Sequence, residues 1–197
     1  TNNCNIYTQT AKKIVVEVRS DFPWAEGGRF NTVHIDDIDY WVEVDVEKNK
    51  WPQMNEKAIK PSPEEAQIAQ NILTIMRDRD VVQLGIGTLP SAVATAMAGA
   101  GLKDLGIHTE MLNYGLINLL ESGQVTNRYK TLPADRGKSV WTLAFPFDTK
   151  WYYETVHRNQ NLAVYDIGYT NNLHNLARLD NLIAINNAVA VDLLGQV

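Results

Sequence analysis

The pattern of apolar and polar positions divides the chain into two parts of different character. Residues 12–18 (KKIVVEV) form a β-branched run and residues 40–48 (YWVEVDVEK) alternate with a period of two, so each segment predicts a strand. Residues 49–63 then contain three prolines and no periodic pattern, which is typical of a linker. We therefore expect a domain boundary here, with residues 1–55 forming the end of one domain plus the linker and residues 56–197 the start of a second domain.

The second part alternates between helix and strand patterns. It opens with a helix signal, because Ser62 supplies an N-cap hydroxyl, Pro63 suits the first helical position and Glu65 completes a capping box. Such alternation predicts an α/β fold with a mostly parallel, doubly wound sheet that is covered by helices on both faces. Strands are expected within residues 77–87, 105–111, 138–146, 162–170 and 181–197, and further helices within residues 89–101, 116–123, 149–159 and 173–180.

Composition and charge narrow the class of protein. The 197 residues carry a net charge of -5 and are 45% hydrophobic, which is ample for a core and offers no basic surface to nucleic acid or an anionic membrane. The single cysteine, Cys4, cannot form an intrachain disulfide, so a reducing cytoplasm is expected. The cysteine and the histidines have no metal-ligand spacing, and no apolar run reaches the roughly 18 residues of a membrane span.

One carboxylate stands where a parallel sheet places its ligands. Glu110 lies within LGIHTEMLNYG (residues 105–115), at the junction between a predicted strand and a helix. The loop Gly85–Pro90 (GIGTLP) follows the preceding strand and opens the next helix. Because the carboxyl ends of parallel strands meet at one edge of a sheet, we expect Glu110 and this loop to face each other. Glycines let backbone N–H groups approach a ligand, and the helix amino terminus adds partial positive charge.

Plainer interpretations of these residues stay open. The loop lacks the third glycine of the dinucleotide fingerprint G-x-G-x-x-G, since Pro90 takes its place. Glu110 also suits a solvated position in the first turn of a helix, where the helix dipole favours carboxylates. His108 precedes Glu110 by two residues and shares its face of a regular strand, yet a lone histidine is more often a structural group than a base. A Ser-His-Asp mechanism is not indicated, because the chain has no G-x-S-x-G nucleophile elbow.

Three motifs taken together resemble a known family. VVQLGIGTLPSAV (residues 81–93), LGIHTEMLNYG (residues 105–115) and AINNAVAVDLLGQV (residues 184–197) occur in the order and at the intervals of the acetyl-CoA hydrolase/transferase family. The resemblance is closest to its 4-hydroxybutyrate CoA-transferase and butyrate:acetate CoA-transferase branch. AKKIVVEV and TVHIDDIDYWVEVD also resemble the end of the family's first domain. The resemblance therefore implies a CoA-transferase-like sheet that is preceded by the tail of another α/β domain.

The resemblance also implies a role for each candidate residue. In the family the glutamate of the H-T-E-M motif, Glu110 here, is the nucleophile that attacks an acyl-CoA thioester and then carries CoA as a glutamyl thioester in a ping-pong reaction. The backbone N–H of Ile86 would be an oxyanion donor. An acyl-CoA and a short-chain carboxylate are the implied substrates, and no metal or resident cofactor is expected. The implied contacts to acyl-CoA come from Gly85, Gly87, Thr88 and Asn113.

Two alternative functions stay open beside CoA transfer. An acyl-CoA hydrolase would share every motif, and a non-catalytic CoA-binding module would keep the loop without the chemistry. Family members begin with a further domain and continue beyond DLLGQV, so the 197 residues resemble the middle of a longer enzyme. Residues 182–194 are almost continuously apolar, so we expect them to be buried in the sheet with neighbours on both sides. The isolated chain is then expected to associate with itself or with the rest of its enzyme.

Overall fold

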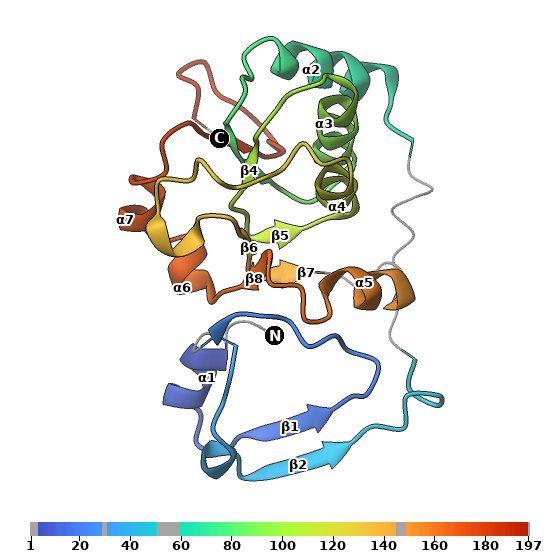
Figure 1. Cartoon of the computed structure of the whole chain (residues 1–197), viewed down its shortest axis with the longest axis vertical. Coiled ribbons are helices and arrows are strands. Elements are labelled where there is room, and N and C mark those ends of the chain that lie inside the picture. Colours follow the sequence, from blue (N-terminus) through green and yellow to red (C-terminus); the bar gives the residue numbers. More distant parts are fainter. Residues whose placement is uncertain (1–3, 29–30, 51–59, 145–148, 197) are drawn as a thin grey trace.

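The computed structural model describes residues 4–28, 31–50, 60–144 and 149–196. The centre of the predicted linker, residues 51–59, and the end of one predicted strand, residues 145–146, lie outside these ranges. Among the described residues no helix is long and apolar enough to cross a bilayer. Figure 1 shows a small two-stranded sheet at one end of the molecule and a larger α/β part at the other.

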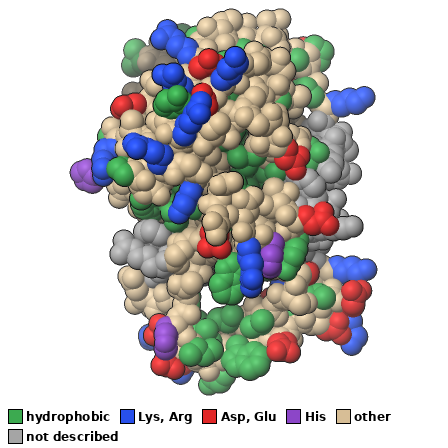
Figure 2. Space-filling model, in the orientation of Figure 1, with side chains coloured by type: hydrophobic (Ala, Val, Ile, Leu, Met, Phe, Trp, Pro, Cys, Tyr) green, Lys and Arg blue, Asp and Glu red, His purple; other side chains and the backbone are tan. Residues whose placement is uncertain are grey.

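The amino-terminal residues form the small sheet. α1 (Cys4–Thr10) precedes β1 (Val15–Val18), and a short 3₁₀ helix, η2 (Ile35–Asp37), leads into β2 (Tyr40–Glu43). β1 and β2 pair in parallel, so both predicted strands are confirmed, although β2 is shorter than its alternating pattern. Figure 2 shows hydrophobic side chains gathered on the surface at this end of the molecule. The exposed apolar residues of the two strands are Val15, Val18, Tyr40, Trp41 and Val42.

The larger part is built on short parallel strands, as the alternation of patterns predicted. β3 lies between β4 and β9, β5 pairs with β7, and β6 pairs with β8, all in parallel. An isolated parallel bridge between His108 and Val140 connects the β4 segment to β6. The strands are β3 (Val81–Leu84), β4 (Gly106–Ile107), β5 (Met111–Leu112), β6 (Ser139–Trp141), β7 (Leu143–Ala144), β8 (Leu162–Val164) and β9 (Leu182–Ile185).

Helices lie on both sides of these strands. In Figure 1, α3 and α4 stand on one side of β4 and β6, and α6 and α7 on the other. The predicted capping box is confirmed at the start of α2, where the Glu65 N–H donates to Oγ of Ser62 at 3.1 Å and the Ser62 N–H donates to Oε2 of Glu65 at 2.8 Å. The helices are α2 (Pro63–Leu73), α3 (Thr88–Gly99), α4 (Tyr114–Glu121), η4 (Pro133–Asp135), α5 (Thr149–Val156), α6 (Ile167–Thr170) and α7 (Leu173–Leu176).

The core fixes α4 closely against α3. Leu84 of β3 and Ile107 of β4 are fully buried in the apolar cluster between the strands and these helices. A Cβ atom added at Gly115 of α4 would lie only 2.6 Å from Cβ of Ala94 in α3, so the absence of a side chain at Gly115 lets the two helices approach. The segment that connects β4 to α4, which contains Glu110, is therefore anchored at both ends.

Two predicted strands in the middle of the chain are shorter than the sequence indicated. The segment 105–111 is interrupted after Ile107 and resumes as β5, so the chain does not pass directly from one strand into α4. The segment 162–170 ends as a strand at Val164, because Asp166 begins α6 by accepting a hydrogen bond at Oδ1 from the Gly168 N–H at 2.7 Å. Side-chain capping by aspartate competes with strand continuation, which the apolar pattern did not reveal.

The prediction for the last segment is wrong in its extent and its burial. Only Leu182–Ile185 form a strand, which pairs with β3 on one side, and the side chains of Val189 and Leu193 are fully exposed. The physical reason lies in the polar residues that interrupt the run. Asn187 donates to the Ile86 carbonyl oxygen, and Oδ1 of Asp192 accepts from the N–H groups of residues 194 and 196, so the chain turns instead of extending the sheet.

Candidate active site

Glu110 is held by its backbone and leaves its carboxylate available at the carboxyl end of β4. Its carbonyl oxygen accepts hydrogen bonds from the N–H groups of Thr142 at 3.0 Å and Leu143 at 2.8 Å, at the junction of β6 and β7. The side chain is half-buried, and its Oε2 accepts a hydrogen bond from Nδ2 of Asn171 at 3.2 Å. Asn171 is exposed, so this carboxylate and its amide partner lie where a solute can reach them.

The glycine loop follows β3 and begins α3, as predicted. Gly87 is the N-cap residue of α3 and has φ +126° and ψ -179°, a conformation that side chains rarely tolerate. A Cβ atom at Gly85 would lie 2.6 Å from Oδ1 of Asn186, and one at Gly87 would lie 2.6 Å from Nδ2 of Asn187. The two glycines therefore let two asparagine side chains approach the loop backbone, and Asn187 donates to the Ile86 carbonyl oxygen at 3.0 Å.

Two side chains next to Glu110 connect its segment to the loop. The Thr109 hydroxyl donates to the Leu84 carbonyl oxygen at 3.1 Å. Nδ2 of Asn113 lies 3.4 Å from the Gly85 carbonyl oxygen, while its Oδ1 accepts from the Leu116 N–H at 2.9 Å and caps α4. Thr109 and Asn113 are both buried. The structure thus gives Asn113 a bridging position between α4 and the loop, and its predicted contact with acyl-CoA stays a prediction.

The other predicted loop residues occupy different environments. The side chain of Ile86 is half-exposed, and the role of its N–H as an oxyanion donor stays a prediction. The Thr88 hydroxyl donates a hydrogen bond to the Glu65 carboxylate and so ties the start of α3 to the start of α2. This bond lowers the pKa of Glu65, helped by the Ser62 N–H. The predicted contact between Thr88 and acyl-CoA also stays a prediction.

Three amide side chains of this region were missed from the sequence. Asn171 touches Glu110, and Asn186 and Asn187 touch the glycine loop. Asn186 and Asn187 lie inside the segment 181–197 that predicts one continuous strand, so the pattern does not mark them as residues at a strand end. A usable signal existed for Asn171, because it directly follows the segment 162–170 that predicts a parallel strand, and ligand-binding residues concentrate at such ends.

A buried cluster of ionisable side chains lies near the end of the β4 segment that leads to Glu110. Lys130 and Asp135 are almost fully buried together with His108. The Lys130 ammonium donates to the carbonyl oxygens of Ile107 and Lys138, each at 2.9 Å. Burial lowers the pKa of Lys130 from its ordinary 10.5 to about 8, although the charge of Asp135 opposes this shift. The cluster therefore contains a lysine whose charge is costly to bury.

The lowered pKa of Lys130 predicts a stability that rises with pH above neutrality. Between about pH 8 and 10.5 the unfolded chain binds the lysine proton and the native chain does not, so the free energy of unfolding increases with pH in this window. We expect a gain of about 2 kcal/mol between pH 7 and pH 9.5 relative to the variant Lys130→Met, which lacks this titration. Urea unfolding of both proteins at several pH values measures the difference, and parallel curves would contradict the assignment.

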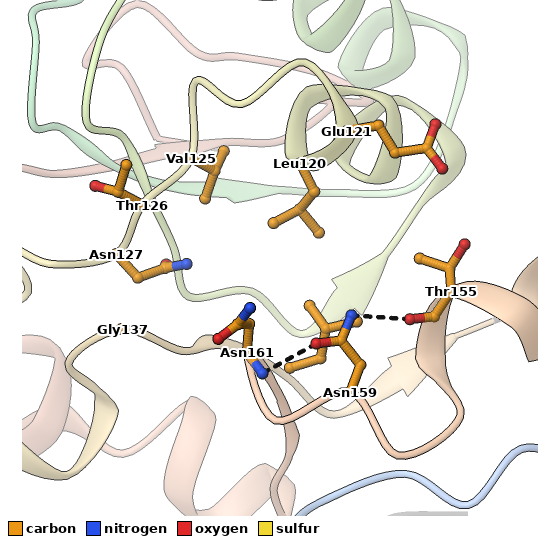
Figure 3. Close-up of a pocket in the computed structure, with 10 residues that line it drawn as sticks. Leu120, Glu121, Val125, Thr126, Asn127, Gly137, Thr155, Asn159 and Asn161 are labelled. Atoms are coloured by element: carbon orange, nitrogen blue, oxygen red, sulfur yellow. Dashed lines mark hydrogen bonds between the residues drawn. The ribbon is translucent and has the colours of Figure 1, made fainter.

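Two hollows open elsewhere on the described surface. One has a volume of about 310 Å³ and is lined by residues from the end of α4, by Val125 to Asn127 and by Asn159 and Asn161, as Figure 3 shows. Because Val125 bridges to Leu105 at the start of the β4 segment, this hollow lies at the opposite strand end from Glu110. The second, of about 410 Å³, is lined by residues 23–28, 31 and 32. Neither is lined by Glu110 or the glycine loop, so neither is the predicted reaction site.

Comparison with known proteins shows that the chain is similar to coenzyme A transferases. Residues 149–197 match the model of the acetyl-CoA hydrolase/transferase C-terminal domain. The chain is 35% identical over 195 residues to a probable butyrate:acetyl-CoA coenzyme A-transferase of Syntrophomonas wolfei, covering 99% of this chain and 42% of that protein. It is also 35% identical over 189 residues to a 4-hydroxybutyrate coenzyme A transferase of Clostridium kluyveri, covering 96% and 41%. The predicted resemblance to the acetyl-CoA hydrolase/transferase family is confirmed.

Solved structures of relatives confirm the α/β fold. The crystal structure of RipA from Yersinia pestis superposes with a TM-score of 0.84 and 32% identity, covering 99% of this chain and 42% of that chain. The 4-hydroxybutyrate CoA-transferase from Porphyromonas gingivalis gives a TM-score of 0.77 at 32% identity, covering 92% and 43%. The chain thus spans about two fifths of the length of the family members that it matches.

No group of three His, Cys, Asp or Glu side chains that could hold a metal ion occurs among the described residues.

Proposed function

We propose that the full native polypeptide transfers CoA between an acyl-CoA and a short-chain carboxylate, with Glu110 as the nucleophile. The observation that carries this proposal is the accessible Glu110 carboxylate, which stands at the carboxyl end of β4 with Oε2 bonded to the Asn171 amide. The names of the relatives from Syntrophomonas wolfei and Clostridium kluyveri, both coenzyme A transferases, favour this class of reaction. Coenzyme A is then a substrate, and no resident cofactor is required.

The proposed reaction needs no external oxidant, metal or nucleotide. The Glu110 carboxylate attacks the thioester carbonyl carbon, the carbon–sulfur bond breaks, and CoA leaves as a thiolate from an acyl-glutamyl anhydride. The thiolate then attacks the glutamyl carbonyl carbon, which releases the first acid as a carboxylate and leaves a glutamyl-CoA thioester. A second carboxylate attacks that thioester and repeats the two steps in reverse, which regenerates Glu110. The anhydride and thioester of glutamate resemble those of the substrates, so no intermediate is a deep energy minimum.

Each step passes through a tetrahedral oxyanion that needs a donor fixed in advance. We assign this role to the backbone N–H of Ile86, which lies in the loop between Gly85 and Gly87, and Gly87 has φ +126°, a conformation that side chains rarely adopt. A preorganised donor of this kind contributes about 3 kcal/mol to transition-state stabilisation. The Asn171 amide orients the Glu110 carboxylate, and Thr109 and Asn113 keep the Glu110 segment beside the loop.

The alternative of an acyl-CoA hydrolase differs only in the final acceptor. In a transferase, butyryl-CoA and acetate are expected to give acetyl-CoA, while butyryl-CoA alone gives little free CoA beyond the amount of enzyme. Chromatography of the CoA species with and without acetate measures both. Sustained release of free CoA that does not depend on acetate would favour the hydrolase and contradict the proposal.

The cellular compartment, the metabolic role, the domain division and the association of the chain are also predicted. The single cysteine favours a reducing cytoplasm, and the substrates indicate short-chain fatty acid metabolism. Division of the chain near residue 55, and association with itself or with further parts of the enzyme, are also predicted. The exposed apolar side chains of β1 and β2 agree with such an association, because a surface of this kind on a soluble protein usually meets a partner.

A further inference from the structure

The cluster of His108, Lys130 and Asp135 buries ionisable side chains in the interior of the fold. The side chains of His108 and Asp135 are 1% and 0% exposed. Taking such groups out of water costs several kcal/mol for each ion unless good geometry repays it. Both residues contact α6, and His108 precedes the candidate nucleophile Glu110 by two residues at the end of the β4 segment. A role beyond packing therefore has to be considered for this pair.

Each ring nitrogen of His108 faces a different oxygen atom. Nε2 is 2.8 Å from the carbonyl oxygen of Thr170, which can only accept, so Nε2 carries a hydrogen. Nδ1 faces Oδ2 of Asp135 at 3.5 Å, and within the described part of the chain neither atom has a hydrogen-bond partner.

The surroundings of Asp135 keep that carboxyl group ionised. Burial by itself raises the pKa of Asp135, but the contact with His108, the charge of Lys130 and the hydrogen bond from Tyr169 outweigh it, so the pKa lies below its ordinary 3.8. The Tyr169 hydroxyl donates to Oδ1 of Asp135 at 2.8 Å. His108 and Asp135 thus form a buried pair, with Asp135 shared between the histidine and a side chain of α6.

His108 and Asp135 hold the short helix α6, and Asn171, the hydrogen-bond partner of Glu110, directly follows this helix. α6 has only four residues, too few for a helix that is stable without tertiary contacts. Tyr169 is held by Asp135, the Thr170 carbonyl is held by His108, and the Thr170 hydroxyl is bonded to the Thr142 hydroxyl. The next residue along the chain is Asn171, whose Nδ2 donates to Oε2 of Glu110.

The contact between His108 and Thr170 and the contact between Glu110 and Asn171 both come from one short stretch of backbone, residues 108–110. His108 and Glu110 lie two residues apart and both contact the segment 170–171, so they act on it from the same face. The His108 N–H donates to the Val82 carbonyl oxygen, and the Glu110 carbonyl is held by the junction of β6 and β7. The distance between the Glu110 carboxylate and the Asn171 amide is therefore set by where His108 holds Thr170.

We propose that His108, paired with Asp135, is a positioning residue that fixes the Asn171 amide against the Glu110 carboxylate. This inference rests on the proposed function, because it assigns to the pair the alignment of the proposed nucleophile. His108 does not touch the reacting atoms. It acts through the Thr170 carbonyl, and its loss is expected to misalign Glu110 without removing any contact to CoA.

Two substitutions in the full native polypeptide test the inference. His108→Leu removes the donor to Thr170 and the partner of Asp135, whereas His108→Gln keeps an amide N–H that can reach the Thr170 carbonyl. For His108→Leu we expect kcat for CoA transfer to fall roughly ten- to a hundredfold while KM for acyl-CoA changes less than about twofold. His108→Gln should recover a large part of kcat. Leu119→Ala is the control, because Leu119 is fully buried in α4, so its loss lowers the melting temperature without touching α6.

A second readout does not depend on activity. The NMR signals of the Asn171 side-chain amide should shift in His108→Leu as they do in Glu110→Gln, and backbone amides of residues 170 and 171 should exchange faster. Unchanged Asn171 signals, or a kcat for His108→Leu equal to that of Leu119→Ala, would overturn the inference. Absence of transfer by the unaltered protein would instead overturn the proposed function, and the Asn171 signals would then decide the positioning inference alone.

Discussion

Replacing Glu110 by glutamine is expected to lower CoA transfer by several orders of magnitude. Glutamine keeps the shape of the side chain and an amide oxygen that can still accept the hydrogen bond from Asn171. It lacks the carboxylate that attacks the thioester, so the covalent route is lost while the fold is kept. Initial rates of acetyl-CoA formation from butyryl-CoA and acetate measure the loss.

Glu121→Gln is the matched control for this substitution. Glu121 is an exposed carboxylate at the end of α4 and lines the hollow at the other end of β4, so the same change of charge there should leave the rate near that of the unaltered protein. Near-normal turnover of Glu110→Gln would remove Glu110 from the mechanism. Equal losses in both variants would point to an effect of charge on the whole protein.

Replacing Gly87 by valine is expected to lower kcat about a hundredfold, with a smaller change in KM for acyl-CoA. The backbone of Gly87 has φ +126°, and a Cβ atom there would lie 2.6 Å from Nδ2 of Asn187. The Asn187 side chain can move aside, but a β-branched residue is strained at this φ, so valine is expected to displace the loop and the Ile86 N–H from the position of the developing oxyanion. The oxyanion exists mainly in the transition state, so the loss should appear in kcat.

A substitution at Gly101, beyond the other end of α3, separates the expected loss of kcat from a loss of stability. Gly101 has φ +70° and nothing within 4 Å of an added Cβ atom, so Gly101→Val strains the backbone without a collision and away from the site. The melting temperature of Gly101→Val should fall while its kcat stays close to that of the unaltered protein. If Gly87→Val changed only KM, the loop would be an element that binds CoA rather than one that stabilises the transition state.

The parts of the fold that depend on neighbouring residues were predictable from the sequence. The capping box of Ser62 and Glu65 is a contact between residues three apart, and the structure has both of its hydrogen bonds. The parallel arrangement followed from the alternation of strand and helix patterns, and it placed Glu110 at a strand end next to the glycine loop.

The parts that depend on distant contacts were not predictable in this way. Asp135 pairs with His108, and Asn171 meets Glu110 across 61 positions of sequence, and no local pattern joins these residues. The apolar run after Ile185 was expected to stay in the sheet, because the pattern counts side chains and does not include the polar contacts of Asn187 and Asp192 that turn the chain. The fold class was therefore easier to predict than the partners of each polar group.

Covalent attachment of CoA to Glu110 is tested most directly by trapping the intermediate. The full native polypeptide is incubated with butyryl-CoA in the absence of an acceptor, treated with borohydride and digested, and the peptide that contains Glu110 is analysed by mass spectrometry. We expect the Glu110 side chain to be reduced to an alcohol, because borohydride reduces a thioester and leaves a free carboxylate unchanged. Omission of butyryl-CoA should abolish the change. An unmodified Glu110 in a protein that still transfers CoA, or reduction at another residue, would contradict it.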